Sequence, residues 1–271
     1  MKTEFETAAF DGLDDGLDVG EDAHERCQIA LSAAALRLLK NLVVFDIETG
    51  PLPEERLRAS LPPFDAAEVK CGNLKDPEKI AAKIAEAKAS YETDFFERAA
   101  LRAETGRVVA IGLGRCDDLD GHLVHYIEGV APGGELPDEK TLLEWFWEVF
   151  VEYVETDCCF CGFNIVGFDV PFLLRRSWLN GVTVPRNVFA PGGRYLNSAA
   201  FVDLLHVWQA GDRQNFISLD RLSQFLDIGQ KNGNGADFHK LWETDHLAAR
   251  EYLTNDLAMT MRCAARLLNF A

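Results

Sequence analysis

The hydrophobic residues of the chain follow two periodicities, which together predict a sheet covered by helices. Short apolar runs rich in Val, Ile and Phe predict strands, and longer runs with apolar residues every three to four positions predict helices. Strands are expected at 41–48, 106–114, 122–128, 157–163 and 201–205. Helices are expected at 24–40, 138–154, 169–180, 219–226 and 247–270. This order predicts an α/β fold with a mixed five-stranded sheet flanked by helices.

Residues 53–104 interrupt this pattern directly after the first strand. Pro51 and Pro53 end the strand, because proline cannot donate a hydrogen bond within a sheet. The stretch 76–102 is rich in Ala, Lys and Glu, which favour helix. We therefore predict a helical insertion at 53–104 within a domain spanning 41–271. Residues 1–40 are expected to form an acidic segment followed by a helix.

The insertion also carries several lysines, and the sequence leaves their role open. They could border a substrate entrance, or they could form only the solvated face of a helix. The residues concerned are Lys70, Lys75, Lys79, Lys83 and Lys88.

The charge of the chain argues at first against contact with nucleic acid. Its formal net charge is −17, whereas proteins that bind nucleic acid usually present a basic surface. The charge is unevenly distributed, however, because residues 170–231 carry seven Lys and Arg against four acids. The overall charge therefore does not exclude a nucleic acid as partner.

Other features indicate a cytoplasmic protein with no membrane partner. No apolar run reaches the roughly 18–20 residues that a spanning helix needs, and residues 1–22 lack the pattern of a secretory signal. The cysteines Cys158, Cys159 and Cys161 lack the spacing of a zinc site. We expect them to be buried thiols on a strand.

Four acids and one tyrosine lie at positions that favour shared chemistry. Asp46 and Glu48 are two residues apart on a strand and face the same side, where like charges repel unless a cation lies between them. Asp169 follows the end of an apolar strand, where α/β proteins place ligand sites. Tyr252 and Asp256 share one face of the last helix.

Each of these residues, taken alone, also has a purely structural explanation. Asp46 and Glu48 could lie where a strand emerges into solvent. Asp169 could cap the following helix through its first amides. Asp256 could face solvent on an amphipathic helix. The order and combination of the residues therefore carry more weight than any single one.

Three motifs stand in sequence: D-I-E-T at 46–49, N-x3-F-D at 164–169 and Y-x3-D at 252–256. In this combination the chain resembles the DEDD exonucleases (the DnaQ-like superfamily), and Tyr252 points to their tyrosine subclass. The histidine subclass would have His at position 251, where this chain has Glu251. The likeness is greatest to the exonuclease domain of family-B DNA polymerases and covers about residues 41–270. It implies an RNase H-like fold.

The resemblance also implies a chemistry, namely hydrolysis of phosphodiester bonds at 3′ ends with two Mg²⁺ or Mn²⁺ ions. Asp46 would bridge both ions, Glu48 and Asp256 would hold the ion that carries the water, and Asp169 would hold the other ion through water. Tyr252 would orient the attacking water. These five residues are the predicted catalytic set, and its four carboxylates are the predicted metal ligands.

The resemblance further suggests substrate contacts. Thr49 and Asn164 would hold the terminal nucleotide, and Phe168 and Phe172 would either stack on bases or pack in the core. Single-stranded DNA is favoured as substrate because the polymerase-like relatives act on DNA, and RNA remains open. Since only fifteen residues follow Asp256, a stand-alone exonuclease is expected.

Two other functions remain open, and the sequence does not indicate the oligomeric state. One is a nucleic-acid-binding module without catalysis, although none of the four acids is lost. The other is an unrelated acidic domain whose carboxylates lie apart on the surface.

Overall fold

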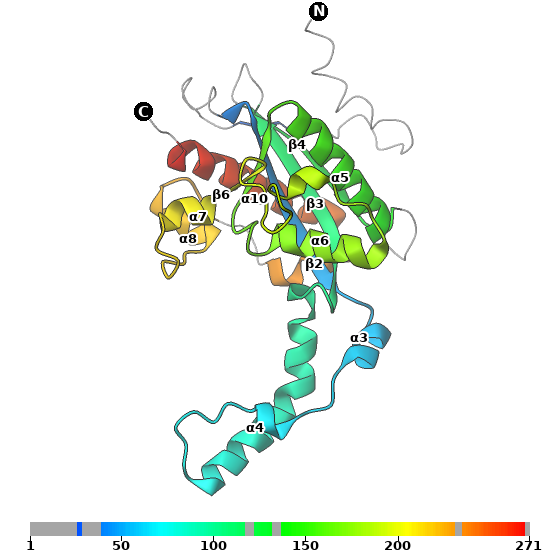
Figure 1. Cartoon of the computed structure of the whole chain (residues 1–271), viewed down its shortest axis with the longest axis vertical. Helices are drawn as coiled ribbons and strands as arrows, with labels where there is room; N and C mark the ends of the chain where they lie inside the picture. Colours follow the sequence, from blue (N-terminus) through cyan, green and yellow to red (C-terminus); the bar gives the residue numbers. More distant parts are fainter. Residues whose placement is uncertain (1–25, 29–38, 117–121, 132–136, 231–234, 269–271) are drawn as a thin grey trace, which may run out of the picture. The chain divides into compact units, whose positions relative to one another are not determined.

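The computed structural model describes residues 26–28, 39–116, 122–131, 137–230 and 235–268 (Figure 1). The chain divides into two compact units. The sheet unit comprises residues 1–48 and 108–271, and the insertion unit comprises residues 49–107. None of the helices in these described ranges is long and apolar enough to cross a membrane.

The central element is a mixed sheet, as predicted. Its strands lie in the order β1 (Arg26–Gln28), β4 (His122–Gly129), β3 (Gly106–Cys116), β2 (Leu42–Pro51), β5 (Cys159–Gly162) and β6 (Phe201–Asp203). β1 and β3 both pair antiparallel with β4. β5 pairs parallel with β2 and with β6. The five expected strands are confirmed, and the three-residue β1 is added at one edge.

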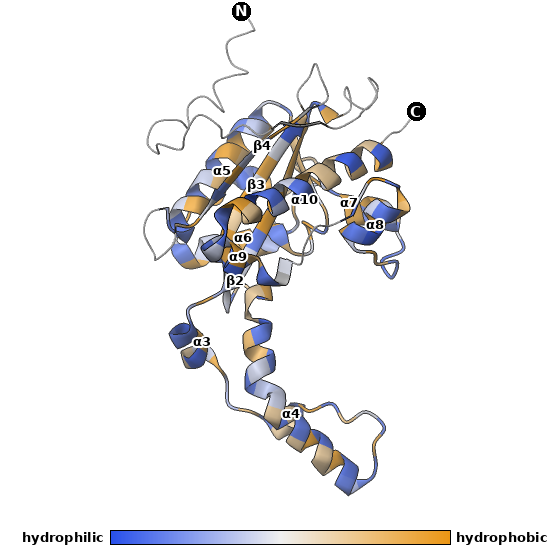
Figure 2. Cartoon of the chain, turned by 180° about the vertical axis from the view of Figure 1, so that it is seen from behind, coloured by the Kyte–Doolittle hydropathy of each residue, from blue (hydrophilic) through white to orange (hydrophobic). Residues whose placement is uncertain are grey.

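Helices cover the sheet on both faces. They are α5 (Glu139–Glu155), α6 (Asp169–Asn180), α7 (Leu204–Gln209), α8 (Leu219–Phe225), α9 (Phe238–Thr244) and α10 (His246–Leu267), with short 3-10 turns η4 (Arg186–Val188) and η5 (Gly235–Asp237). Figure 2 shows β3 as largely hydrophobic, whereas hydrophobic and hydrophilic residues alternate along α5 and α10. The fold is therefore the expected RNase H-like α/β arrangement.

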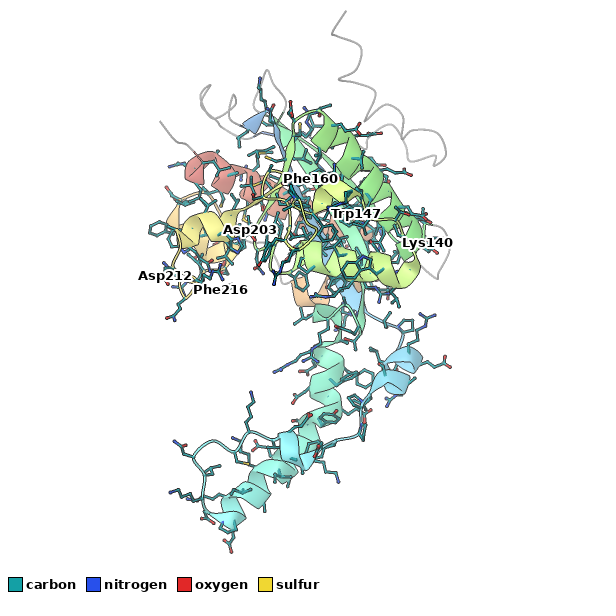
Figure 3. The ribbon with its side chains drawn as sticks, viewed as in Figure 1. Lys140, Trp147, Phe160, Asp203, Asp212 and Phe216 are labelled. Carbon is teal, nitrogen blue, oxygen red and sulfur yellow. The ribbon has the colours of Figure 1, made fainter. Side chains whose placement is uncertain are left out.

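One face of the sheet packs against α5 through aromatic rings. Phe45 of β2 lies 5.7 Å from Phe146 of α5, measured between ring centroids, and Phe150 lies 5.0 Å from Phe160 of β5. Figure 3 shows Phe160 among the central strands. Because side chains alternate along a strand, the odd-numbered positions of β2 near Phe45 face α5.

The opposite face packs against α10. Val44 of β2 belongs to the same buried cluster as Leu257 of α10. At Gly112 of β3, an added Cβ would lie only 2.9 Å from the side chain of Leu253. A residue without a side chain is thus needed where α10 crosses β3. The even-numbered positions of β2 near Val44 face this helix.

Helix α6 is fixed to α5 by a buried polar network. The Arg176 guanidinium pairs with Glu139 at 2.6 Å, and Glu139 also accepts a hydrogen bond from the Val108 amide of β3 at 2.8 Å. Trp147 donates to the Ser177 hydroxyl at 2.8 Å. These contacts fix the orientation of the helix that begins at Asp169.

Helix boundaries follow their predicted caps closely. α6 spans the predicted 169–180 and ends at Gly181, whose φ of 68° lies in the left-handed region that favours glycine. Asp138 accepts from the Thr141 amide before α5, and Ser218 accepts from the Arg221 amide before α8. These starts were readable because capping depends on local sequence.

Two expectations need correction. The helix predicted at 24–40 is wrong at residues 26–28, which pair with β4 as strand β1; residues 24–25 and 29–38 lie outside the described part of the chain. The strand predicted at 201–205 ends at Asp203, because that side chain caps α7. Helix α9 lies in a stretch for which no element was predicted, and its aromatic residues Phe238 and Trp242 are buried.

The cysteine prediction is confirmed in its main point. Cys158 and Cys161 are buried and Cys159 is partly buried, in or directly beside β5. Burial raises the pKa of the Cys161 thiol well above its usual range, so the group stays protonated and apolar in character.

The insertion unit is helical, as expected. It contains α3 (Glu54–Ser60), the 3-10 turns η1 (Ala66–Glu68) and η2 (Ala99–Leu101), and α4 (Pro77–Glu97). Asp76 caps α4 by accepting from the Glu78 amide, and no residue of α4 is buried. Arg58 forms an exposed ion pair with Glu54 within α3, and a second one with Glu92 that connects α3 to α4. The role of the lysines in this unit stays a prediction.

Candidate active site

Strand β2 carries the first two acids of the site. Asp46 and Glu48 occupy even-numbered positions, so they extend toward the face that α10 covers. Asp46 is partly buried and Glu48 is buried. An explanation as a strand end emerging into solvent therefore fails for Glu48.

Helix α10 carries the third acid to the same place. Tyr252 and Asp256 lie one turn apart and are both buried, Asp256 to 1% exposure. Carboxylate oxygens of Asp46, Glu48 and Asp256 all lie within 4.8 Å of one another. Asp256 is thus not a solvent-facing acid. These three carboxylates form one cluster, which excludes the alternative of separate surface features.

Asp169 joins the site through β2. Its Oδ1 accepts a hydrogen bond of 3.1 Å from the amide of Ile47, the residue between Asp46 and Glu48, across 122 positions of sequence. Asp169 is the first residue of α6, and Phe168 occupies the cap position without a side-chain hydrogen bond. The alternative that Asp169 caps its own helix is therefore wrong.

The electrostatics of Asp169 reflect this location. Burial raises the pKa of its carboxyl well above the usual range, and the negative charge of nearby Asp46 raises it further. The hydrogen bond from Ile47 acts in the opposite direction. An ionised Asp169 is thus unfavourable unless a positive charge is supplied.

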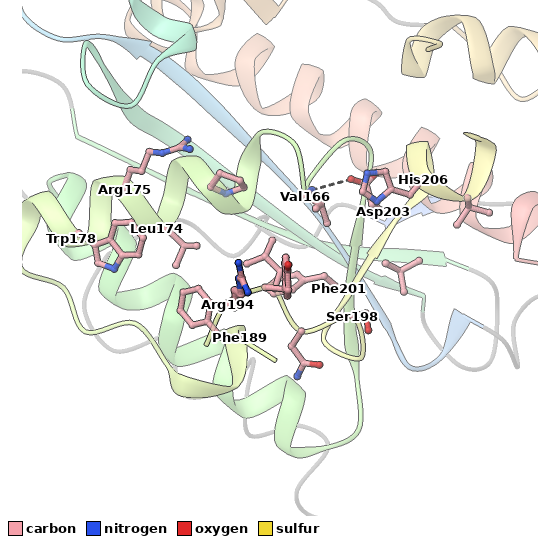
Figure 4. A pocket seen from close by; sticks show the side chains of 16 residues that line it. Val166, Leu174, Arg175, Trp178, Phe189, Arg194, Ser198, Phe201, Asp203 and His206 are labelled. Carbon is pink, nitrogen blue, oxygen red and sulfur yellow. Dashed lines mark hydrogen bonds between the residues drawn. The ribbon is translucent and has the colours of Figure 1, made fainter. Parts of the chain in front are cut away.

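A fifth acid, Asp203, was not among the predicted site residues, and it shapes the loop before Asp169. The amides of Asn164 and Leu205 donate to its Oδ1 and the amide of Val166 donates to its Oδ2, each at 2.9 Å. The side chain is buried, and Figure 4 shows its bond to Val166. An acid at the end of an apolar strand, immediately before a helical run, was the available signal.

Asn164 has a structural role that the structure explains without substrate. Its φ is +62°, and its carbonyl accepts from the amides of Gly167 and Phe168 at 3.1 Å and 2.9 Å. An added Cβ at Gly167 would lie 2.4 Å from Asn164 Oδ1, so a larger residue there would displace the Asn164 side chain. Asn164 therefore shapes the turn that leads to Asp169.

The other residues predicted to contact substrate differ in exposure. Phe172 is buried and lies 5.5 Å from the ring of Phe168, which is only partly buried. Phe172 thus packs in the core, as one of the two alternatives held. Thr49 is buried on β2 directly after Glu48. Substrate contacts of Thr49, Asn164 and Phe168 stay predictions.

Tyr252 is held by elements that the sequence did not reveal. Phe238 of α9 lies 5.8 Å from its ring, Trp242 stacks on Phe238, and Trp242 donates to the Val130 carbonyl at 2.9 Å. An added Cβ at Gly235 would lie 3.2 Å from the Tyr252 hydroxyl and 3.7 Å from Glu48 Oε2. The Tyr252 hydroxyl therefore lies on the side of Glu48 and its acidic cluster, beside the closely approaching backbone of Gly235.

The donor set fits a divalent cation. Hard cations such as Mg²⁺ and Mn²⁺ prefer oxygen ligands, and carboxylates are the common ones. Three carboxylates gathered in a largely buried place repel one another unless a positive charge compensates them. The acidic cluster is thus suited to hold a divalent cation.

Residues 98–267 match the family model described as a predicted 3′–5′ exonuclease related to the exonuclease domain of PolB. The match covers well over half of the chain. The chain belongs to this family. No curated protein matches the sequence.

Membership in the exonuclease family supports a hydrolase that acts on nucleic acid, and families of this kind typically use divalent metal. The matched region contains Asp169, Tyr252 and Asp256 but begins after Asp46 and Glu48. Inclusion of β2 in the site therefore rests on the structure, in which the acids of β2 lie beside Asp256.

Proposed function

We propose that this protein is a metal-dependent 3′–5′ exonuclease of the DEDD tyrosine subclass, which removes nucleotides from the 3′ ends of single-stranded DNA. One observation carries the proposal: carboxylate oxygens of Asp46, Glu48 and Asp256 lie within 4.8 Å of one another. The carboxylate of Asp169 lies beside them, because it accepts a hydrogen bond from the Ile47 amide of β2. Family membership supports the nuclease activity in general.

The four carboxylates are the proposed ligands of two Mg²⁺ or Mn²⁺ ions. When bound, such ions offset the charge of the phosphate and make a bound water more acidic. The four negative charges of Asp46, Glu48, Asp169 and Asp256 match the four positive charges of two divalent ions. The assembled site is then close to neutral and accepts a phosphate.

The protein positions these ligands with backbone contacts. The Ile47 amide donates to one oxygen of Asp169 and holds this carboxylate beside β2. The Asp203 carboxylate orders the turn of Asn164 and Val166 that precedes α6. Ligands placed in advance in this way do not have to be ordered when substrate arrives.

Tyr252 is the proposed group that orients the attacking water. Its hydroxyl lies near Glu48, and its ring is packed against Phe238. A hydroxyl within hydrogen-bonding distance of the water can donate or accept a hydrogen bond, and this bond would fix the direction from which the water attacks. Burial of the ring keeps the hydroxyl in one position.

Substrate selection rests on the relation to the polymerase exonuclease domain. Thr49, Asn164 and Phe168 are proposed to hold the terminal nucleotide, and DNA is the proposed substrate. The alternative is that RNA is the substrate and is likewise shortened from its 3′ end, and the experiment below distinguishes the two.

The experiment uses single-stranded DNA and RNA of equal sequence, labelled at the 5′ end and incubated with Mn²⁺. A ladder that shortens from the 3′ end, faster for DNA, is expected. Asp46→Ala should abolish this ladder, because that carboxylate is proposed to touch both ions. Internal cleavage, or an Asp46→Ala protein as active as wild type, would contradict the proposal; binding without cleavage by wild type would favour a silent binding module.

A further inference from the structure

A second candidate binding region lies beside the loop that leads to Asp169. It is a cavity of about 800 Å³ lined by Leu174, Arg175 and Trp178 of α6 on one side and by residues of the 189–203 segment on the other (Figure 4). Val166 and Asp203 also line it. The hydrogen bond that orders the loop before Asp169 is therefore part of the cavity wall.

The charged groups of this cavity favour an anion. Arg175 and Arg194 are both exposed, and neither forms an ion pair or a hydrogen bond with any residue that the structure describes. The one acid in the lining, Asp203, already accepts three backbone hydrogen bonds. In a chain with a net charge of −17, two such arginines beside one cavity make a local positive site.

The cavity also presents exposed aromatic rings. Trp178 is 61% exposed and Tyr195 is 70% exposed, and both line the cavity. The Arg194 guanidinium lies 5.8 Å from the centre of the Tyr195 ring. Exposed rings next to arginines are the pattern by which proteins bind unpaired nucleotides, with bases on rings and phosphates on guanidinium groups.

The segment that carries Arg194 and Tyr195 is ordered by its own hydrogen bonds. Phe189 pairs with Leu196 in an antiparallel bridge, and the Ala190 amide donates to the Tyr195 carbonyl at 2.9 Å. Gly192 and Gly193 supply the positive φ angles of 96° and 69° that the turn needs. Tyr195 thus stands at the base of a short hairpin.

We infer that this cavity binds an unpaired nucleotide of the substrate strand, on the 5′ side of the nucleotide that is removed. A base would stack on Trp178 or Tyr195, and Arg175 and Arg194 would contact backbone phosphates. The inference rests on the proposed function: when hydrolysis takes the 3′-terminal nucleotide, all remaining nucleotides lie on its 5′ side. The volume is in the range of pockets that hold a group of this size.

Binding is measured with a 5′-labelled single-stranded oligonucleotide of about twelve nucleotides and full-length protein, with Ca²⁺ replacing the catalytic ions. The Arg175→Gln/Arg194→Gln double variant should bind at least about 10-fold more weakly, and its log–log salt slope should fall by about 0.7 for each lost phosphate contact. Trp178→Ala should weaken binding about 5- to 100-fold, as for loss of a stacked base.

Two matched controls accompany these variants. Leu179→Ala changes the next residue of α6, which is 67% exposed and does not line the cavity. Arg266→Gln removes an exposed arginine from the last turn of α10. Both controls should bind as wild type does, and melting curves of all variants should coincide.

The second readout is hydrolysis of a mononucleotide ester, thymidine 5′-p-nitrophenyl phosphate, which has neither the base nor the further phosphates that the cavity is inferred to bind. Cavity variants should raise KM for the oligonucleotide while hydrolysing the ester at the wild-type rate. Oligonucleotide affinities and salt slopes equal to those of the controls would overturn the inference, even if wild type shortens DNA. If oligonucleotide binding depended on these residues but no cleavage occurred, the result would support nucleotide binding in the cavity and would contradict the proposed exonuclease activity.

Discussion

Strands β2 and β6 run in the same direction through β5, so their carboxyl ends reach the same edge of the sheet. Both bring carboxylates there, but the two ends use them differently. Asp203 at the end of β6 accepts three backbone amide hydrogen bonds. Asp46 and Glu48 of β2 meet the carboxylate of Asp256 instead.

The difference shows how the surroundings of an acid separate a structural role from the proposed role of metal ligand. Three amide hydrogen bonds satisfy both oxygens of Asp203, so this side chain can be buried without a cation. Asp169 differs, because burial raises the pKa of its carboxyl and the negative charge of nearby Asp46 raises it further. The acids of β2 therefore favour a cation, whereas Asp203 orders a loop.

After the loss of activity expected for Asp46→Ala, the largest effect concerns the acidic cluster that α10 shares with β2. Tyr252→Phe keeps the ring and its packing on Phe238 and deletes only the hydroxyl, so binding of metal and DNA should survive. Single-turnover cleavage should slow by about 10²- to 10⁴-fold, the usual scale for a positioned proton-handling group. Tyr91→Phe, which deletes a hydroxyl in the insertion unit, is the control and should cleave normally. A wild-type single-turnover rate for Tyr252→Phe would remove this residue from the mechanism.

The next effect tests the β6 side. Asp203→Asn keeps the size of the side chain but leaves one oxygen and no charge for three amide donors. We expect the free energy of unfolding of the metal-free protein to fall by about 2–4 kcal/mol, measured by urea unfolding. Asp46→Asn is the matched control, and it should be neutral or stabilising because it removes a repelling charge. If both variants lowered the free energy of unfolding equally, Asp203 and Asp46 would not differ in their contribution to stability, which would contradict the separate roles described above.

The smallest effect concerns pH. The pKa of Asp169 is raised in the folded protein, so the folded state binds a proton that the unfolded state releases. Stability of the metal-free protein should therefore increase as pH falls from this raised pKa toward the ordinary value of 3.8. Asp169→Asn lacks this titration, and the difference in unfolding free energy between the two proteins isolates it. A difference that stays constant over this pH range would contradict the raised pKa.

Much of the fold was readable from local sequence because its signals are local. Helix α6 has the predicted limits, since Gly181 supplies the left-handed ending. β1 and α9 were missed, because each depends on a distant partner: β1 pairs with β4, and α9 packs its aromatic residues on α10 and on the segment after β4.

The same division holds for the site. The candidate acids were found because motif spacing places Asp46 with Glu48, and Tyr252 with Asp256, on shared faces. Asp203 and Gly235 were not found, because their importance lies in bonds and close approaches to residues far along the chain. The position of Asp203 at a strand end could have indicated a cap, but no local pattern indicates its bonds to Asn164 and Val166 or the approach of Gly235 to Tyr252.

By itself, the sequence determined the periods of strands and helices and the pairing of residues on one face of each, because these follow from backbone geometry. Tertiary structure alone decided that the faces meet. Gly112 lets α10 approach β3 closely, which places Asp256 beside Asp46 and Glu48. The Ile47 amide donates a hydrogen bond to Asp169, which lies 122 positions further along the chain. Burial then turns four acids with separate structural explanations into one site, since like charges held together out of water favour a cation.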